Sequence, residues 1–176
     1  MIRAATFDPE RIYRYRLSRV WNDSLPAATW IMLNPSTADE QKDDRTISRV
    51  IDFSRRWGYG SALVTNLFAY RTPSPAFLRR AQDPVGPLND ESVAVAVRQA
   101  STVMAAWGNH GSLANPATGV SRSDEMLQLL DEFGIEIEML RLTAQGQPAH
   151  PLYLPSHIRP KSICHQYTAK QRPGRI

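Results

Sequence analysis

The sequence predicts an α/β fold in which helices cover both faces of a mainly parallel sheet. Short apolar runs, typical of strands buried on both faces, alternate with segments whose apolar side chains recur at helical spacing. This alternation of strand and helix requires right-handed crossovers between parallel strands. We therefore expect a three-layer sandwich with a mainly parallel four-stranded central sheet, preceded by an N-terminal β hairpin or edge strand.

The N-terminal strand or hairpin is expected within residues 11–21. Tyrosine and leucine side chains alternate there with Arg14, Arg16 and Ser18, and a period of two is that of a β-strand. We expect this strand to carry its arginines on one face.

The remaining elements follow in regular order along the chain. The helix after the first buried strand places Ile47, Val50 and Trp57 on one face, and Asp43 or Asp44 can cap its start. Ser74 opens a further short helix. We expect buried strands at 29–33, 61–65, 102–106 and 135–140, and longer helices at 43–57, 89–100 and 123–133.

Length and charge indicate one domain with a basic end. The chain has 176 residues, is 42% hydrophobic and carries a net charge of +4, which suits a single compact domain. We place an α/β domain at residues 1–154 and a basic C-terminal tail at 155–176. The tail has no acidic residue, and its basic residues are Arg159, Lys161, Lys170, Arg172 and Arg175. Because all but three of the 21 basic residues are arginines, contact with phosphate is one interpretation.

Several classes of protein are disfavoured by missing features. No apolar run approaches the roughly 20 residues of a membrane span, and the start of the chain has no apolar signal-peptide core. A single cysteine, Cys164, excludes an internal disulfide framework. Glycine-rich dinucleotide and P-loop motifs and the nucleophile elbow of hydrolases are also missing. We expect a cytoplasmic protein with no cofactor, no metal site and no membrane partner; the sequence does not indicate an oligomeric state.

Polar and aromatic residues follow the predicted strands at the point where each strand ends. Ligands of such sheets bind beyond the carboxyl ends of the strands. Amide side chains match the edge of a nucleobase, aromatic rings stack on its face, and a histidine donates to an oxygen that gains charge. The alternative is that the asparagines only cap turns and that Trp107 belongs to the core. The strand-end candidates are Asn34, Pro35, Ser36, Asn66, Phe68, Trp107, His110, His150 and Tyr153.

Longer motifs resemble a known family over nearly the whole chain. They are Tyr13-x-Tyr15-x-Leu17, Leu33-Asn-Pro-Ser-Thr-Ala38, Asp43-Asp44-x-Thr46, Asn66-Leu-Phe-Ala-Tyr-Arg71, Asp83-Pro-Val-Gly-Pro87, Ala106-Trp-Gly108 and His150-Pro-Leu-Tyr153. These motifs resemble the domain-of-unknown-function (DUF) family 1643. The resemblance implies no particular activity, because the family is functionally undefined. Arg71, at the end of its motif, joins the candidate substrate-binding residues.

A second resemblance covers fewer residues. The order of Asn34-Pro35, Asn66 and His150-Pro151 along the chain is similar to that of the motifs in the uracil-DNA glycosylase superfamily. It implies that Asn34 orients a water, that Asn66 reads the base edge, and that His150 stabilises charge on the departing base.

The same resemblance implies that Phe68 stacks on the base, and that Leu152 or Tyr153 fills the gap left by an extruded base. The chain departs from those enzymes in having Leu33 instead of a small residue, Leu152 where serine is common, and an acidic loop at 39–44.

The sequence thus leaves three functions open. The first is glycosylase-like cleavage of an N-glycosidic bond, with Asn34 and His150 as catalytic residues. The second is a non-catalytic module that binds a nucleobase, a nucleotide or nucleic acid in the same place. The third is an enzyme that acts on another small metabolite. The acidic loop favours a small ligand, whereas the arginine-bearing face and the basic tail favour a polymer.

Overall fold

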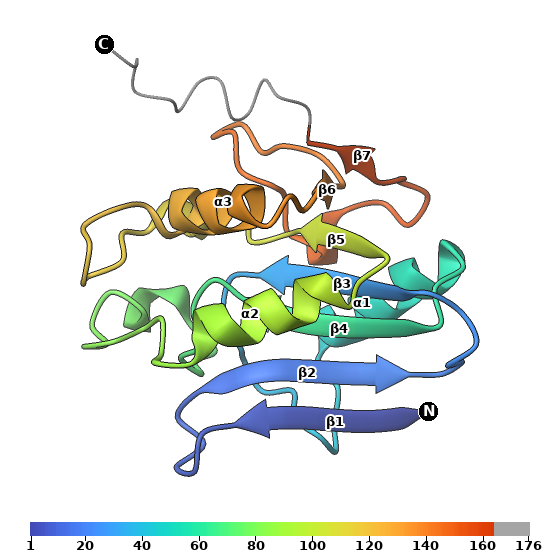
Figure 1. Cartoon of the computed structure of the whole chain (residues 1–176), viewed down its shortest axis with the longest axis horizontal. Helices are drawn as coiled ribbons and strands as arrows, with labels where there is room; N and C mark the ends of the chain where they lie inside the picture. The colour runs from blue at the N-terminus through green and yellow to red at the C-terminus, as the bar shows by residue number, and fades with distance from the viewer. Residues whose placement is uncertain (164–176) are drawn as a thin grey trace.

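A computed structural model describes residues 1–163 of the chain as a seven-stranded mixed sheet between helices (Figure 1). The strands, in sheet order β1-β2-β4-β3-β5-β6-β7, are β1 (Ile2–Phe7), β2 (Arg14–Val20), β4 (Ser61–Asn66), β3 (Ala27–Met32), β5 (Thr102–Ala105), β6 (Glu138–Met139) and β7 (Lys161–Ser162). The predicted α/β class is confirmed.

The direction of the strands divides the sheet into a centre and two margins. Strands β4, β3, β5 and β6 run parallel to one another, whereas β1, β2 and β7 pair antiparallel with their neighbours. The sheet is therefore wider than the expected four strands with a hairpin or edge strand. The additional strand β7 comes from the segment that charge alone had placed in the tail.

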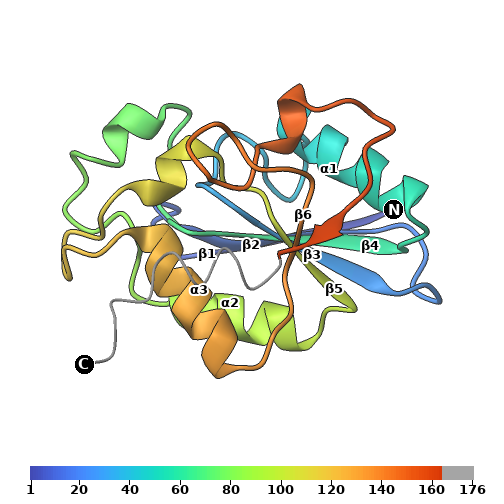
Figure 2. The same ribbon diagram turned by 90° about the horizontal axis from the view of Figure 1, so that it is seen from above.

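Helices cover both faces of the sheet, with α1 on one face and α2 and α3 on the other (Figure 2). The helices are α1 (Arg45–Arg56), α2 (Asn89–Arg98) and α3 (Arg122–Glu132), with short 3₁₀ turns at Pro75–Phe77, Asn109–Ser112 and Pro151–Tyr153. Helix α1 begins where Asp44 caps it, because the Asp44 carboxylate accepts a hydrogen bond from the backbone N–H of Ile47 at 2.9 Å.

Each face of the sheet has its own hydrophobic core. Beneath α1, Trp30 lies 5.6 Å from Trp57 and 6.2 Å from Phe53 between ring centroids, and its indole N–H donates to the Ser54 hydroxyl. Beneath α2 and α3, Ile31 belongs to a second buried cluster. Strand β3 thus contributes to both cores, as expected for a strand buried on both faces.

A β-bulge in β2 divides the predicted arginine-bearing face. Thr6 pairs with Arg16 and Phe7 pairs with Arg14, so Tyr15 has no partner on β1. Arg16 lines a groove beside α2, whereas the guanidinium of Arg14 reaches the carbonyl of Ala38 on the side of α1. The expectation of a single face was wrong because a bulge changes the alternation of side chains along a strand.

The segment that follows residue 154 continues the domain. Ile158 packs on the core beneath α1, and β7 pairs with β6. Residues 155–163 thus contact the α/β domain, and the distal basic residues Lys170, Arg172 and Arg175 lie outside the described residues. Among residues 1–163 no helix is long and apolar enough to cross a membrane.

Candidate functional site

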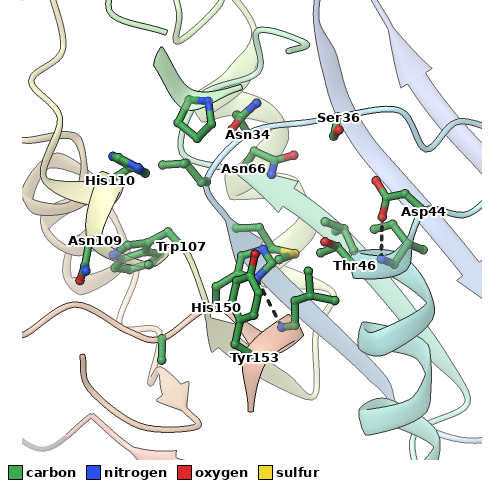
Figure 3. Close-up of a pocket in the computed structure, with 18 of the residues that line it drawn as sticks. Asn34, Ser36, Asp44, Thr46, Asn66, Trp107, Asn109, His110, His150 and Tyr153 are labelled. Atoms are coloured by element: carbon green, nitrogen blue, oxygen red, sulfur yellow. Dashed lines mark hydrogen bonds between the residues drawn. The ribbon is translucent and has the colours of Figure 1, made fainter. Parts of the chain in front are cut away.

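A cavity of about 590 Å³ opens at the carboxyl ends of the parallel strands (Figure 3). Its wall comes from the ends of β3, β4 and β5, the first turn of α1 and the turn at Pro151–Tyr153. The polar side chains in this wall include Arg14, Asn34, Ser36, Asp44, Thr46, Asn66, Asn109, His110, His150 and Tyr153. Segments far apart in the sequence meet here because all parallel strands end at the same edge of the sheet.

Most of the residues expected at the site lie in this wall. In the close-up, Asn34 and Asn66 lie across the cavity from His150 and Tyr153 (Figure 3). The predicted residues that line the cavity are Asn34, Ser36, Asn66, Trp107, His110, His150 and Tyr153.

Three predicted residues lie outside the wall. Phe68 is 1% exposed and belongs to the core beneath α2 and α3, so its ring is not placed to stack on a ligand. Arg71 lies over the ring of Phe7, 4.8 Å from the centroid, and donates to the carbonyl of Arg11. Pro35 supports the site through its carbonyl, which accepts a hydrogen bond from the Asn34 amide at 2.9 Å. The expected stacking and binding roles of these residues need correction.

Trp107 forms part of the wall without offering a free ring face. The residue is 1% exposed, and its indole N–H donates to the side-chain oxygen of Gln147 at 2.8 Å. Gly111 packs against the indole so closely that a Cβ there would lie 2.1 Å from Cδ1 of Trp107. Trp107 is thus a core residue that shapes the cavity, which was the alternative considered from the sequence.

Asn66 lines the cavity and has a buried polar atom without a hydrogen-bond partner among the described residues. It is the last residue of β4 and is 1% exposed, and no donor among the described residues reaches its side-chain oxygen. An unpaired buried polar atom costs about 1–3 kcal/mol, so such atoms call for an explanation. A ligand that donates to this oxygen provides one.

Asn34 is held by its own loop. Its side-chain N–H₂ donates to the carbonyl of Pro35 at 2.9 Å and to that of Thr72 at 2.7 Å. Because these bonds use both protons of the amide nitrogen, only the oxygen remains to act on a ligand or a water.

His150 is oriented by the turn that follows it. Its Nδ1 accepts a hydrogen bond from the backbone N–H of Leu152 at 3.3 Å, which places the proton of the neutral ring on Nε2. Burial lowers the pKa of His150 below its usual value, although the nearby Asp44 carboxylate opposes this shift. At neutral pH the ring is therefore an uncharged donor. Tyr153, 82% exposed, lies at 6.0 Å from it between ring centroids.

The cavity also contains polar residues that were not predicted as site residues. Asp44 and Thr46 enter the wall from the start of α1, and Asn109 accepts a hydrogen bond from the Thr143 hydroxyl at 2.5 Å. The sequence favours Asp44 as a helix cap over one half of a catalytic or metal-binding carboxylate pair with Asp43, and a cap beside a strand end also faces the ligand crevice. Arg14 was missed because alternation alone assigns it to the face of Arg16.

The described residues offer no group of three or more His, Cys, Asp and Glu side chains that could hold a metal ion. His157, Cys164 and His165 are metal-ligand residue types that lie close together in the sequence. His157 is exposed, whereas Cys164 and His165 lie outside the part of the chain that the structure describes.

Comparison with protein families gives a match over most of the chain. The model described as "Protein of unknown function (DUF1643)" covers residues 14–152. The chain belongs to the DUF1643 family. The match begins at the first residue of β2 and ends in the turn after His150, so the DUF1643 region contains nearly the whole wall of the cavity. No curated protein and no solved structure matches the chain.

Proposed function

We propose that this DUF1643 protein binds a nucleobase or a nucleotide in the cavity at the carboxyl ends of its parallel strands. The observation that carries the proposal is the buried side-chain oxygen of Asn66, which lacks a donor among residues 1–163. An asparagine amide presents an acceptor and a donor side by side, in the arrangement that matches the edge of a base.

The dimensions and lining of the cavity support a ligand of this class. A volume of about 590 Å³ lies within the usual range of roughly 300–1,000 Å³ for small-molecule sites. Asn34 adds a fixed acceptor, and His150 adds an uncharged donor across the cavity. Acceptors and a donor on opposite walls suit a flat heterocycle with a carbonyl on one edge.

Binding is tested by titration calorimetry with free bases, nucleosides and nucleoside 5′-monophosphates. We expect Asn66→Ala to weaken binding at least about tenfold, because one or two hydrogen bonds to the base are lost. The control is Asn22→Ala, since Asn22 lies in a turn outside the cavity wall. If Asn66→Ala and Asn22→Ala bind the ligand equally well, Asn66 does not contact the ligand. A failure of all three ligand classes to bind would leave the third function, an enzyme of another metabolite.

A glycosylase-like reaction is the second candidate, and His150 favours it. A water would attack the anomeric carbon as the C–N bond breaks. The electron pair of the C–N bond would pass to the base, and the base would finally take a proton from the water. An uncharged Nε2–H can stabilise the oxygen of the departing base, and the Asn34 oxygen can orient the water. These roles are those implied by the similarity to the uracil-DNA glycosylase superfamily.

The reaction is tested with oligonucleotides that contain uracil, hypoxanthine or modified bases, and separately with nucleosides. We expect base release by the natural chain and a loss of about 100-fold or more in His150→Gln. Binding without release of any base would indicate the non-catalytic module.

For a polymeric ligand, the affinity must fall steeply with salt. An affinity for DNA that does not change with salt would exclude the polymer and favour a free nucleotide.

A further inference from the structure

Arg14 is a buried cation in the wall of the cavity. The residue is 2% exposed, and its Nη1 donates to the carbonyl of Ala38 at 2.8 Å. Its Nε is buried and has no acceptor among residues 1–163, and none of their ion pairs includes Arg14. One edge of the guanidinium, formed by Nε and Nη2, thus has no partner in the described part of the chain.

The bulge in β2 accounts for this position. Regular alternation from Arg16 would direct residue 14 toward the groove beside α2. Because Tyr15 is the extra residue of the bulge, Arg14 turns to the opposite side and enters the cavity. Bulges often re-aim a side chain beside a functional site.

The other fully buried arginines of the described residues have carboxylate partners. Arg19 donates to Asp43 at 2.6 Å, and Arg122 forms ion pairs with Asp90 and Glu125. A buried charge without a partner is destabilising by several kcal/mol. Arg14 is therefore the buried arginine that has no ion pair within residues 1–163, and the carboxylates of Asp44 and Asp39 act on it only from a greater distance.

We propose that Arg14 binds the phosphate group of a nucleotide ligand through its Nε–Nη2 edge. This edge of a guanidinium donates two parallel N–H bonds, and a phosphate accepts them in the same plane. The proposal rests on the proposed nucleotide function for the rest of the ligand, but the phosphate site itself can be tested separately.

Neighbouring groups complete the phosphate site. The first turn of α1 reaches the cavity at Thr46, and the start of a helix favours negative charge. In the close-up Ser36, Asp44 and Thr46 lie on one side of the cavity, away from Asn109 and His110 (Figure 3). The hydroxyls of Ser36 and Thr46 are donors that suit the remaining phosphate oxygens.

Asp44 is the group that opposes an anion at this end. Its carboxylate is held as the cap of α1 by the N–H of Ile47 and forms no ion pair with Arg14. Burial lowers the pKa of Arg14 to about 10, so the guanidinium is still charged at neutral pH. The free edge of Arg14 therefore attracts an anionic ligand at this end of the cavity, whereas Asp44 repels it.

The proposal is tested by calorimetric titration of three probes: inorganic phosphate, nucleosides and nucleoside 5′-monophosphates. We expect the natural chain to bind a monophosphate at least about tenfold more tightly than its nucleoside, as charged hydrogen bonds contribute that much. Arg14→Met should remove this preference. Arg16→Met is the matched control, because Arg16 lies two residues away on the opposite face and lines the other groove, and it should retain the preference.

Arg14→Lys keeps the positive charge without the bidentate edge of the guanidinium. It should retain only part of the preference for a monophosphate over its nucleoside. Unfolding of this variant is measured as well, so that a misfolded variant is recognised. A monophosphate and a nucleoside that bind equally, in the natural chain and in Arg14→Met, would overturn the phosphate site while the base site stands. Phosphate that binds in an Arg14-dependent way, while no nucleoside binds, would overturn the base site instead. If acetate displaces phosphate at equal concentration, the site is for carboxylates and the proposal fails.

Discussion

Arg14 and Arg19 lie on the same strand, β2, and both are almost fully buried, yet their guanidinium groups have different surroundings. Arg19 donates to the Asp43 carboxylate and to the carbonyls of Ser18, Asp39 and Lys42. Arg14 donates to the carbonyl of Ala38 alone. Arg19 connects the loop before α1 to the sheet, whereas Arg14 lines the cavity and has donors without a partner among residues 1–163.

This difference separates a structural arginine from one that awaits a ligand. When a buried charge has its carboxylate and its acceptors inside the chain, removing it breaks a complete network. When a buried charge lacks these acceptors, its burial destabilises the fold, so a contribution to stability does not explain why the residue is there. Four measurements test this distinction between side chains that stabilise the fold and side chains that act on a ligand.

The largest expected effect is on stability. Arg19→Met should lower the free energy of unfolding by about 3–5 kcal/mol, because it breaks the buried ion pair with Asp43 and three hydrogen bonds to carbonyls. Arg14→Met should leave the same free energy unchanged or raise it, because the substitution loses a single hydrogen bond and removes a buried charge that has no carboxylate partner among the described residues. Urea unfolding of both variants measures the difference. Equal losses would mean that Arg14 is as structural as Arg19.

The same contrast is expected between the two asparagines of the cavity. Asn34→Ala removes two hydrogen bonds to loop carbonyls and should cost about 1–3 kcal/mol of stability. Asn66→Ala removes an oxygen with no donor among the described residues and should cost less. Thermal or urea unfolding without ligand compares them, and a greater loss in Asn66→Ala would show that Asn66 has a structural task.

Removal of the negative charge of Asp44 is expected to raise the affinity for the ligand instead of lowering it. Asp44→Asn keeps a residue that caps helices well and removes the negative charge from the phosphate end of the cavity. We expect the affinity for nucleoside monophosphates to rise about three- to tenfold, as expected for one partly screened charge at several ångströms. Calorimetry at fixed ionic strength measures it. Unchanged affinity would mean that the phosphate does not lie near Arg14 and Asp44.

The smallest expected effect concerns His150 and pH. The pKa of His150 is lower in the folded chain than in the unfolded chain. As the pH falls, the unfolded chain therefore binds a proton at His150 before the folded chain does. Stability is lost as the pH falls below the unfolded pKa of about 6.5 and toward the folded pKa. His150→Gln should flatten this part of the stability profile. His157→Gln, a change at an exposed histidine, should leave the profile as it is; if it flattens the profile equally, the assignment to His150 is wrong.

Much of the fold could be predicted from the sequence. The strands expected at 29–33 and 61–65 correspond to β3 and β4, and the helix expected at 43–57 corresponds to α1. These elements carry strong periodic patterns. Strand β6 lies within the strand expected at 135–140 but has only two residues. Strand β7 also has two residues, which is too short for a pattern of its own, and only its pairing with β6 defines it.

The site was predictable where it depends on topology. Asn34 and Asn66 line one cavity because parallel strands end at one edge of the sheet, and this follows from the order of elements. His150 joins them from the loop that follows β6. Phe68 was misplaced because the chain after β4 turns into the core beneath α2 and α3. Arg14 could not be placed from the sequence, since a single extra residue in a bulge reverses the face.

One titration tests the central claim, that a nucleotide bridges Asn66 and Arg14. Nuclear magnetic resonance can follow the side-chain N–H₂ of Asn66 and the Nε–H of Arg14 while a nucleoside 5′-monophosphate is added. We predict that both resonances shift along a single binding curve with one dissociation constant, while the Nε–H of Arg19 stays in place. A nucleotide that binds with neither the Asn66 nor the Arg14 resonance shifting would contradict the account.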